Sequence, residues 1–403
     1  MHRLSRDELP EKDMSSHHQV DGNQLTLLQN GTAFFPQLCA DIDAAQHSIY
    51  LETYIFAADG AGRMVAAALQ RAAVRGVVVR VLLDGFGSAG LPRSWVAELR
   101  IAGVQVEWFR RKISPLTLRR SRLRRLHRKL AVMDGEVAFV GGINITDDIA
   151  EYSDVSLPRL DYAVRVQGTV AGEVHMAMRR LWSAVSWANF RKRGKRIQRL
   201  VRGRHKPTAT PHIIFLQRDN LRYRRDIKHA YLRAITEAQR EIIIANAYFL
   251  PGLAFRRALV RAARRGVRVV LLLQGRIEYR LQHYATHALY GQLLAAGIEI
   301  YEYQASYLHA KVAVVDGQWA TVGSFNIDPF SLLLAREANL AVQDAGFAGK
   351  LRASLQAVIT NDAVRIGSEY GRPHNFLNRL VARLSYGVVR LLIGMLGHRR
   401  GGS

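Results

Sequence analysis

The stretch LHRKLAVMDG at residues 126–135 decides the fold, because it returns as LHAKVAVVDG at residues 308–317. In both copies the Lys lies two positions after the His, the Asp seven positions after it and the Asn seventeen positions after it. The copies therefore agree in spacing as well as in residue type. Two such matches with the same register indicate an internal duplication.

Each copy has the residue types that could bind and cleave a phosphodiester. Apolar residues fill the space between His and Asp, which is typical of a buried strand. His and Lys lie two positions apart, so their side chains point to the same face of that strand. Lys and the Asn amide can hold phosphate oxygens, while one His attacks the phosphorus and the other protonates the leaving oxygen. The candidate residues are His127, Lys129 and Asn144 in the first copy, and His309, Lys311 and Asn326 in the second.

The doubled motif resembles the signature of the phospholipase D superfamily, over about residues 20–360. Within that superfamily, REIIIANAYF at 240–249 and ATVGSFNIDP at 320–329 are similar to the short bacterial cardiolipin synthases, which lack N-terminal membrane spans. The resemblance implies two homologous α/β sandwich domains related by a pseudo-twofold axis, with the active site at their interface. It implies no metal and no other cofactor.

Four acidic residues accompany the motif. The resemblance counts Asp134 and Asp316 as catalytic, but they fall at the far end of the predicted strands and could instead bind turn amides. Asp161 and Glu337 follow their histidines by 34 and 28 residues. In the superfamily an acid at about this place hydrogen-bonds the ring of the catalytic His, and such a bond would fix the tautomer of the imidazole.

The composition of the chain sets limits on its organisation. A length of 403 residues suggests two domains, and 49% hydrophobic residues can fill two cores. One cysteine, Cys39, permits no internal disulfide and favours a reducing compartment. The net charge of +25 implies an anionic partner, either acidic lipid or nucleic acid. The polar start predicts no secretory signal, and no apolar run reaches the length of a membrane span.

Hydrophobic periodicity predicts alternating elements in the first half, and the second half repeats its landmarks. We expect helices at 30–45, 64–75 and 95–102 and strands at 48–56, 77–83 and 104–109. Glu52 lies inside the first of these strands, and it could either pair with an arginine or serve the site. The predicted domains are 21–205 and 206–365, between a disordered N-terminus at 1–20 and an amphipathic basic tail at 366–403.

Three basic segments have two interpretations each. The run at 110–125 occurs only in the first half, and it is either a solvated loop or a mouth that attracts anionic head groups. The run at 191–206 is either a solvated linker or a further basic surface. Residues 376–397 have apolar side chains at helical spacing beside arginines, which is typical of a core helix or of a helix lying in the membrane plane.

Together with the resemblance, these features predict a cardiolipin synthase. It would transfer a phosphatidyl group from one phosphatidylglycerol to another through a phosphohistidine, on His127 by resemblance, and release glycerol. We expect it to bind phosphatidylglycerol, cardiolipin and the membrane surface rather than nucleic acid, peripherally on the cytoplasmic face of the bacterial inner membrane. A phospholipase or nuclease that uses water is the alternative enzyme, and a binding scaffold without turnover is a third possibility. The sequence sets no oligomeric state.

Overall fold

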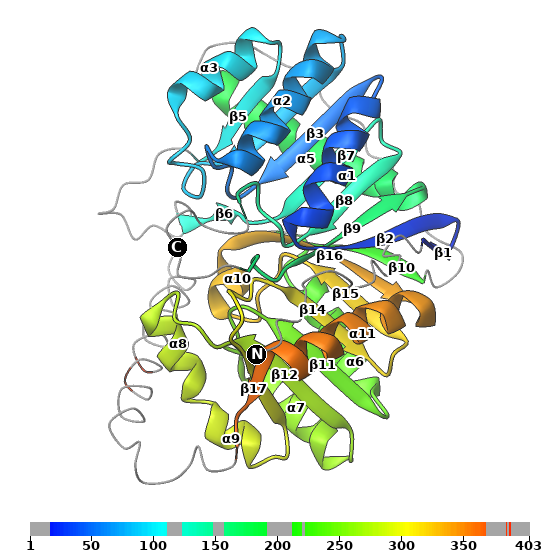
Figure 1. Cartoon of the computed structure of the whole chain (residues 1–403), viewed down its shortest axis with the longest axis vertical. Helices are drawn as coiled ribbons and strands as arrows, with labels where there is room; N and C mark the ends of the chain where they lie inside the picture. Colours follow the sequence, from blue (N-terminus) through cyan, green and yellow to red (C-terminus); the bar gives the residue numbers. More distant parts are fainter. Residues whose placement is uncertain are drawn as a thin grey trace, which may run out of the picture.

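Two α/β halves stacked on one another make up the computed structural model (Figure 1). The structure describes residues 17–110, 123–147, 157–191, 212–219 and 222–367, together with Leu384 and Gly387. The predictions for most of the basic insertion, for the linker and for nearly all of the tail therefore fall outside the described residues. The domain boundary at 205–206 likewise stays a prediction.

The first half is built around a mixed sheet with the strand order β1-β2-β9-β8-β7-β3-β4-β5. Its elements are β1 (His18–Val20), β2 (Asn23–Gln29), α1 (Asn30–Ala44), β3 (Ser48–Thr53), α2 (Gly60–Val74), β4 (Val78–Asp84), α3 (Arg93–Ile101), β5 (Gln105–Phe109), β6 (Arg125–Leu126), β7 (Lys129–Met133), β8 (Val137–Gly141), β9 (Tyr162–Gln167) and α5 (Thr169–Arg191). The motif strand β7 lies near the middle of this sheet, antiparallel to β3.

The second half repeats this order as β10-β16-β15-β14-β11-β12-β13-β17. Its elements are β10 (Ile213–Arg218), α6 (Asp226–Glu237), β11 (Glu241–Asn246), α7 (Leu253–Arg264), β12 (Arg268–Gln274), α8 (Arg280–His287), α9 (Tyr290–Leu294), β13 (Glu299–Tyr303), β14 (Lys311–Val315), β15 (Trp319–Gly323), α10 (Pro329–Leu333), β16 (Ala335–Gln343), α11 (Ala345–Asp362) and β17 (Ala363–Arg365). The strands from β2 to β9 thus have counterparts from β10 to β16, which confirms the predicted duplication.

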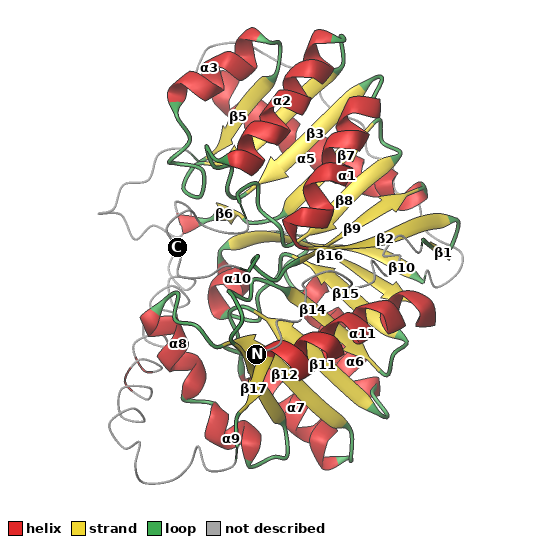
Figure 2. Cartoon of the chain, viewed as in Figure 1, coloured by secondary structure: helices red, strands yellow, loops and turns green. Residues whose placement is uncertain are grey.

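Each sheet lies between two layers of helices, and one core joins the halves (Figure 2). Alternate residues of β3 and β7 face the helices α1 to α3 on one side and α5 on the other. The second sheet has α6 and α7 on one side and α11 on the other. The core that contains α5 and α11 is continuous from one half to the other. The predicted pair of α/β sandwiches is confirmed, and their shared core fixes how the two motifs face each other.

The predicted elements occur with shifted ends. Gly76 and Gly266 follow α2 and α7 with φ of 89° each, a conformation that favours glycine and ends a helix. Helix α2 starts four residues before the predicted start, because Asp59 accepts a hydrogen bond from the amide of Gly62 and caps it. The prediction of disorder over 1–20 was wrong for residues 18–20, which pair with β2 as β1. No described helix is long and apolar enough to cross a membrane.

A buried ion pair lies beneath the motif of the first half. The guanidinium of Arg128 donates to both carboxylate oxygens of Glu52, the Nη2–Oε1 distance being 2.8 Å, and both side chains are 3% exposed. The prediction that Glu52 pairs with an arginine is therefore confirmed. At the equivalent places in the second half, fixed by the pairing of β3 with β7 and of β11 with β14, stand Ala245 and Ala310.

We expect Arg128→Ala to lower the free energy of unfolding by about 3–5 kcal/mol, because it leaves the Glu52 carboxylate buried without its partner. The double variant Glu52→Ala with Arg128→Ala recreates the pair of alanines in the second half and should be less destabilised than Arg128→Ala. Urea unfolding measures both, with the exposed pair Arg233 and Glu237 as a control whose loss costs at most about 0.5 kcal/mol. A double variant less stable than either single variant would contradict this account.

Candidate active site

The two histidines of the motif lie at the seam between the halves, each held by the backbone of the opposite half. The amide of His127 donates to the carbonyl of Arg336 at 3.0 Å, and the amide of His309 donates to the carbonyl of Leu160 at 2.8 Å. The short strand β6 pairs with β16, and Leu160 forms an isolated bridge with Leu308. The start of each motif strand is therefore positioned by the other domain, as a site at their interface requires.

The acidic partners of the histidines are crossed between the halves. Nδ1 of His127 lies 3.0 Å from both carboxylate oxygens of Glu337, 210 residues away. Nδ1 of His309 lies 2.6 Å from Oδ2 of Asp161, 148 residues away. The sheet register makes the two acids equivalent. Asp161 lies two residues before Ala163, which pairs with Gly141. Glu337 lies two residues before Asn339, which pairs with Gly323. Both predicted acids thus contact a histidine ring, and each carboxylate sets the tautomer that leaves Nε2 free to react.

The two acids are held differently because they differ in length. Ser324 donates its hydroxyl to Oε2 of Glu337 at 2.6 Å. Its counterpart in the first half is Gly142, where an added Cβ would lie 2.3 Å from Oδ1 of Asp161. The shorter aspartate approaches the backbone at that point and accepts the amide of Tyr162 at 2.8 Å. Gly142 is therefore needed for the Asp161–His309 pair.

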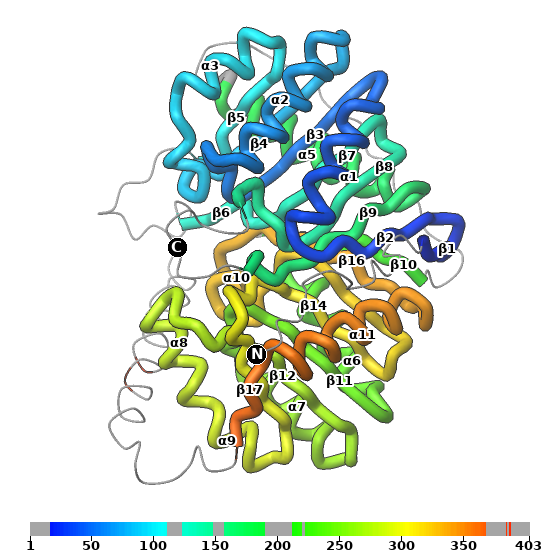
Figure 3. Tube along the Cα trace, in the orientation of Figure 1, coloured from blue at the N-terminus to red at the C-terminus, as the bar shows by residue number. Residues whose placement is uncertain are grey.

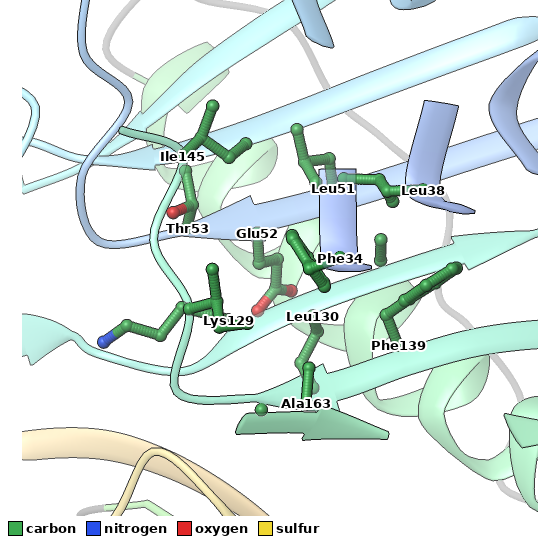
Figure 4. A pocket seen from close by; sticks show the side chains of 13 residues that line it. Phe34, Leu38, Leu51, Glu52, Thr53, Lys129, Leu130, Phe139, Ile145 and Ala163 are labelled. Carbon is green, nitrogen blue, oxygen red and sulfur yellow. The ribbon is translucent and has the colours of Figure 1, made fainter. Parts of the chain in front are cut away.

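Two buried lysines supply the positive charge of the site. Nζ of Lys129 donates to the carbonyl of His127 at 2.6 Å, and Lys311 makes the same bond to His309. Figure 4 shows the Lys129 side chain extending away from the apolar side chains behind it, among them Phe34 and Phe139. Both amines thus project from the sheets beside the histidines.

The basic side chains of the site have lowered pKa values, and burial is the largest cause in each case. Burial lowers the pKa of Lys129 to about 7 and that of Lys311 to about 8. Burial also lowers the pKa of His127, against the opposing effect of Glu337. The pKa of His309 lies well below its usual value. Burial is the largest cause, and the positive charge of Lys311 is the next. The charge of His127 also contributes to that shift.

We expect kcat/KM to fall as the pH rises above about 8. A lysine with a lowered pKa is cationic below that pKa and loses its charge as the pH passes through it, so Lys129 and Lys311 would become neutral near pH 7 and 8 rather than above 10. The charge that attracts a phosphodiester is then lost. A pH profile of kcat/KM on a soluble substrate measures this limb, and a rate that stays level to about pH 10 would contradict it.

The remaining residues of the predicted set divide into two groups. Asn144 and Asn326 are buried, and Oδ1 of Asn144 accepts the amide of Ile55 at 3.2 Å, which leaves its NH2 group for another acceptor. Oδ1 of Asn326 is buried without a hydrogen-bond partner among the described residues. Asn144 and Asn326 therefore stay candidates for phosphate binding.

Asp134 and Asp316 require a correction. Each lies at the far end of a five-residue strand, about 16 Å along the strand from its lysine. Asp134 accepts the amides of residues 46, 47 and 48, and Asp316 accepts those of residues 239, 240 and 241. Their counting as catalytic residues was wrong, because the signature fixes the turn that holds the motif strand rather than a contact with phosphate. The alternative, that they bind turn amides, is confirmed.

The sequence reasoning missed three further side chains around the histidines. The ring of Tyr54 packs edge-on against His127 with centroids 5.0 Å apart. Asp84 accepts the amide of Leu126 at 2.7 Å, and its counterpart Gln274 accepts that of Leu308 at 2.6 Å. Asp84 and Gln274 are the last residues of β4 and β12, and the Gly that follows each was the only signal in the sequence. No described group of three or more His, Cys, Asp or Glu side chains could hold a metal ion.

The fold and the site together define an enzyme of the phospholipase D type, with paired His and Lys side chains from two repeats around one reaction centre. A family model described as "Cardiolipin synthase, PLD-like domain" matches residues 38–156 and 231–359. Cardiolipin synthase B of Salmonella typhi is 39% identical over 378 residues, which cover 94% of this chain and 90% of that protein. Cardiolipin synthase B of Escherichia coli K12 is 36% identical with the same coverage.

The chain therefore belongs to the cardiolipin synthase family, and it is a phosphatidyltransferase of the phospholipase D superfamily. Among solved structures, phosphatidylserine synthase of Haemophilus influenzae Rd KW20 has the same fold, with a TM-score of 0.67 over 92% of this chain and 94% of that one. The two sequences are 14% identical, so this likeness concerns the fold alone.

Proposed function

We propose that the protein is a cardiolipin synthase that joins two phosphatidylglycerol molecules and releases glycerol. The crossed pairs His127–Glu337 and His309–Asp161 at the seam support this proposal most directly. Cardiolipin synthase B relatives, matched over 94% of this chain, support the choice of lipid substrates. The protein acts peripherally at the cytoplasmic face of the inner membrane, where phosphatidylglycerol is available.

The reaction has two displacements at one phosphorus. Nε2 of His127 attacks the phosphorus of the first phosphatidylglycerol, and the bond from phosphorus to the glycerol oxygen breaks. His309 gives its proton to that oxygen, so glycerol leaves and a phosphatidyl-histidine remains. His309 then takes the proton of a hydroxyl on the second phosphatidylglycerol, whose oxygen attacks the phosphorus, and the electrons of the P–N bond return to His127. Lys129, Lys311, Asn144 and Asn326 bind the phosphoryl oxygens throughout.

The lowered pKa of His309 fits this sequence when substrate binding is considered. The free site places its histidines among cations, so His309 is neutral before the substrate arrives. A bound phosphodiester brings a negative charge against the same side chains and raises the pKa of His309. Proton uptake by His309 is therefore coupled to substrate binding. His309 becomes the acid that protonates the leaving oxygen only when a substrate is present.

Purified protein incubated with phosphatidylglycerol vesicles in a buffer containing a chelator tests the proposal. The expected products are cardiolipin and free glycerol, in equal amounts, measured by lipid mass spectrometry and a glycerol assay. Plasmid DNA under the same conditions should stay intact. Phosphatidic acid in place of cardiolipin, or cleaved DNA without lipid conversion, would instead establish water as the acceptor.

A further inference from the structure

Two loops at the edge of the molecule where the histidines lie carry large apolar side chains exposed to solvent. The loop after β4 holds Phe86, which is 53% exposed. The loop after β12 and the first turn of α8 hold Ile277, Tyr279 and Leu281, which are 48%, 57% and 43% exposed. These loops, residues 85–88 and 275–281, are counterparts in the duplication, because β3 pairs with β4 as β11 pairs with β12. We call them the rim loops.

The topology places both rim loops at the edge of the sheets where the motif strands begin. Strand β4 runs parallel to β3, and β7 runs antiparallel to it, so the end of β4 and the start of β7 lie at the same edge. The second half repeats this with β12 and β14. Each rim loop also begins directly after the side chain, Asp84 or Gln274, that holds the residue before a catalytic histidine. Each rim loop therefore lies beside the catalytic histidine of its own half.

Tyr279 marks how closely the second rim loop approaches the site. Its ring lies 5.8 Å from that of Tyr248, which follows β11. It also contributes to the raised pKa of Tyr54 in the first half, although burial is the largest cause. In Figure 3 the trace of β6, which leads to His127, and that of α8, which follows the second rim loop, run along the same side of the molecule.

The polar side chains of the rim loops are those of a membrane interface. The guanidinium of Arg125 stands 5.0 Å from the ring centre of Phe86, and Arg280 is exposed between Tyr279 and Leu281. Glu278, the one acid of the second rim loop, is occupied by the hydroxyl of Tyr248 at 2.7 Å. Single exposed apolar residues are ordinary on a protein surface. Here four of them lie on the two rim loops beside arginines, on a chain with a net charge of +25.

We propose that the two rim loops are the membrane-binding surface of the protein and that their partner is a bilayer containing anionic phospholipid. Phe86 of the first rim loop and Ile277, Tyr279 and Leu281 of the second enter the interfacial region, while the arginines contact head-group phosphates. The active site then opens onto the bilayer, so a lipid can place its head group at the histidines with its acyl chains still among other lipids. This inference rests on the proposed function for its lipid substrates.

Vesicle binding tests the rim directly. The variant Ile277→Asp with Leu281→Asp should bind vesicles of phosphatidylglycerol and phosphatidylcholine at least about tenfold more weakly than the wild type in a flotation assay. The matched control is Val74→Asp with Ile101→Asp, which changes the net charge equally at residues that are 78% and 86% exposed. These residues lie at the ends of α2 and α3, on the edge opposite the histidines, so the control should bind like the wild type. Phe86→Asp provides a second, single change on the other rim loop.

The readouts separate the rim from the chemistry. Transfer between short-chain phosphatidylglycerol molecules below their micelle concentration should be unchanged in the rim variants, whereas transfer in vesicles should fall with binding. Rim variants that float with vesicles as the wild type does, or controls that lose binding equally, would overturn the inference. A wild type that binds vesicles through the rim without making cardiolipin would refute the proposed function and leave the rim assignment standing.

Discussion

Alanine at either His127 or His309 is expected to lower phosphatidyl transfer by at least about a thousandfold. One imidazole forms the bond to phosphorus and the other moves the proton, and neither step has a second group that could replace it. The two rings are equivalent in the duplication but not interchangeable, because each is held by the acid of the opposite half. The rate of cardiolipin formation measures both losses.

Peptide mass spectrometry after a rapid quench should distinguish the roles of the histidines. Wild-type protein mixed with phosphatidylglycerol should carry the phosphatidyl group on the peptide containing His127, and His127→Ala should carry none. His229→Ala serves as the control, since this exposed histidine lies on α6 and should leave the rate unchanged. An adduct on His309 would exchange the two roles, and near-normal transfer by either active-site variant would refute the two-histidine scheme.

The duplicated motif allowed much of this site to be predicted because it depends on short-range patterns. Alternation along the motif strands places His and Lys on one face, and spacing alone relates the two copies. The same patterns predicted the buried strands and the helices that end at glycine. The alternative interpretation of Asp134, as an acceptor of turn amides, could be drawn because its place at the end of an apolar run is local information.

The partnership between each histidine and an acid could not be read in the same way. The sequence offered Asp161 and Glu337 at unequal distances from their own histidines, 34 and 28 residues, which made the equivalence of the two acids uncertain. The register of β8 with β9 and of β15 with β16 restores it, and the extra residues of the first half lie between those strands. That the acids serve the opposite histidines depends on how two separate sheets pack, which no local pattern encodes.

The differences between the halves were hidden for a related reason. Arg128 with Glu52 in one half and Ala310 with Ala245 in the other fill equivalent space, but their equivalence emerges only from strand pairing. The same holds for Ser324 and Gly142, whose identities follow from the length of the acid they contact. The two histidines are therefore supported by different side chains, although the motif itself is nearly identical.

The crossed pairs lead to the second large effect that we expect. Glu337→Gln and Asp161→Asn should each lower kcat by about 10²–10⁴-fold with little change in KM. A carboxylate only accepts hydrogen bonds, so it keeps the proton of His127 or His309 on Nδ1 and leaves Nε2 free to act. An amide can donate instead, which stabilises the opposite tautomer and places a proton on the reactive nitrogen. Glu299→Gln, in an ion pair with Arg268 away from the histidines, is the matched control.

Nitrogen NMR of the imidazole rings makes the crossing itself testable. If the pairs are crossed, Glu337→Gln shifts the ring nitrogens of His127, which lies in the other domain, and leaves those of His309 near their wild-type positions. Asp161→Asn has the reverse effect. If the acids had only a structural role, their variants would lose activity without these shifts in the histidine of the other domain. A shift confined to the histidine of the same half would show that each acid acts within its own domain. The reciprocal result would mean that neither half can complete a reactive histidine alone, so duplication of the domain made this site dependent on both copies.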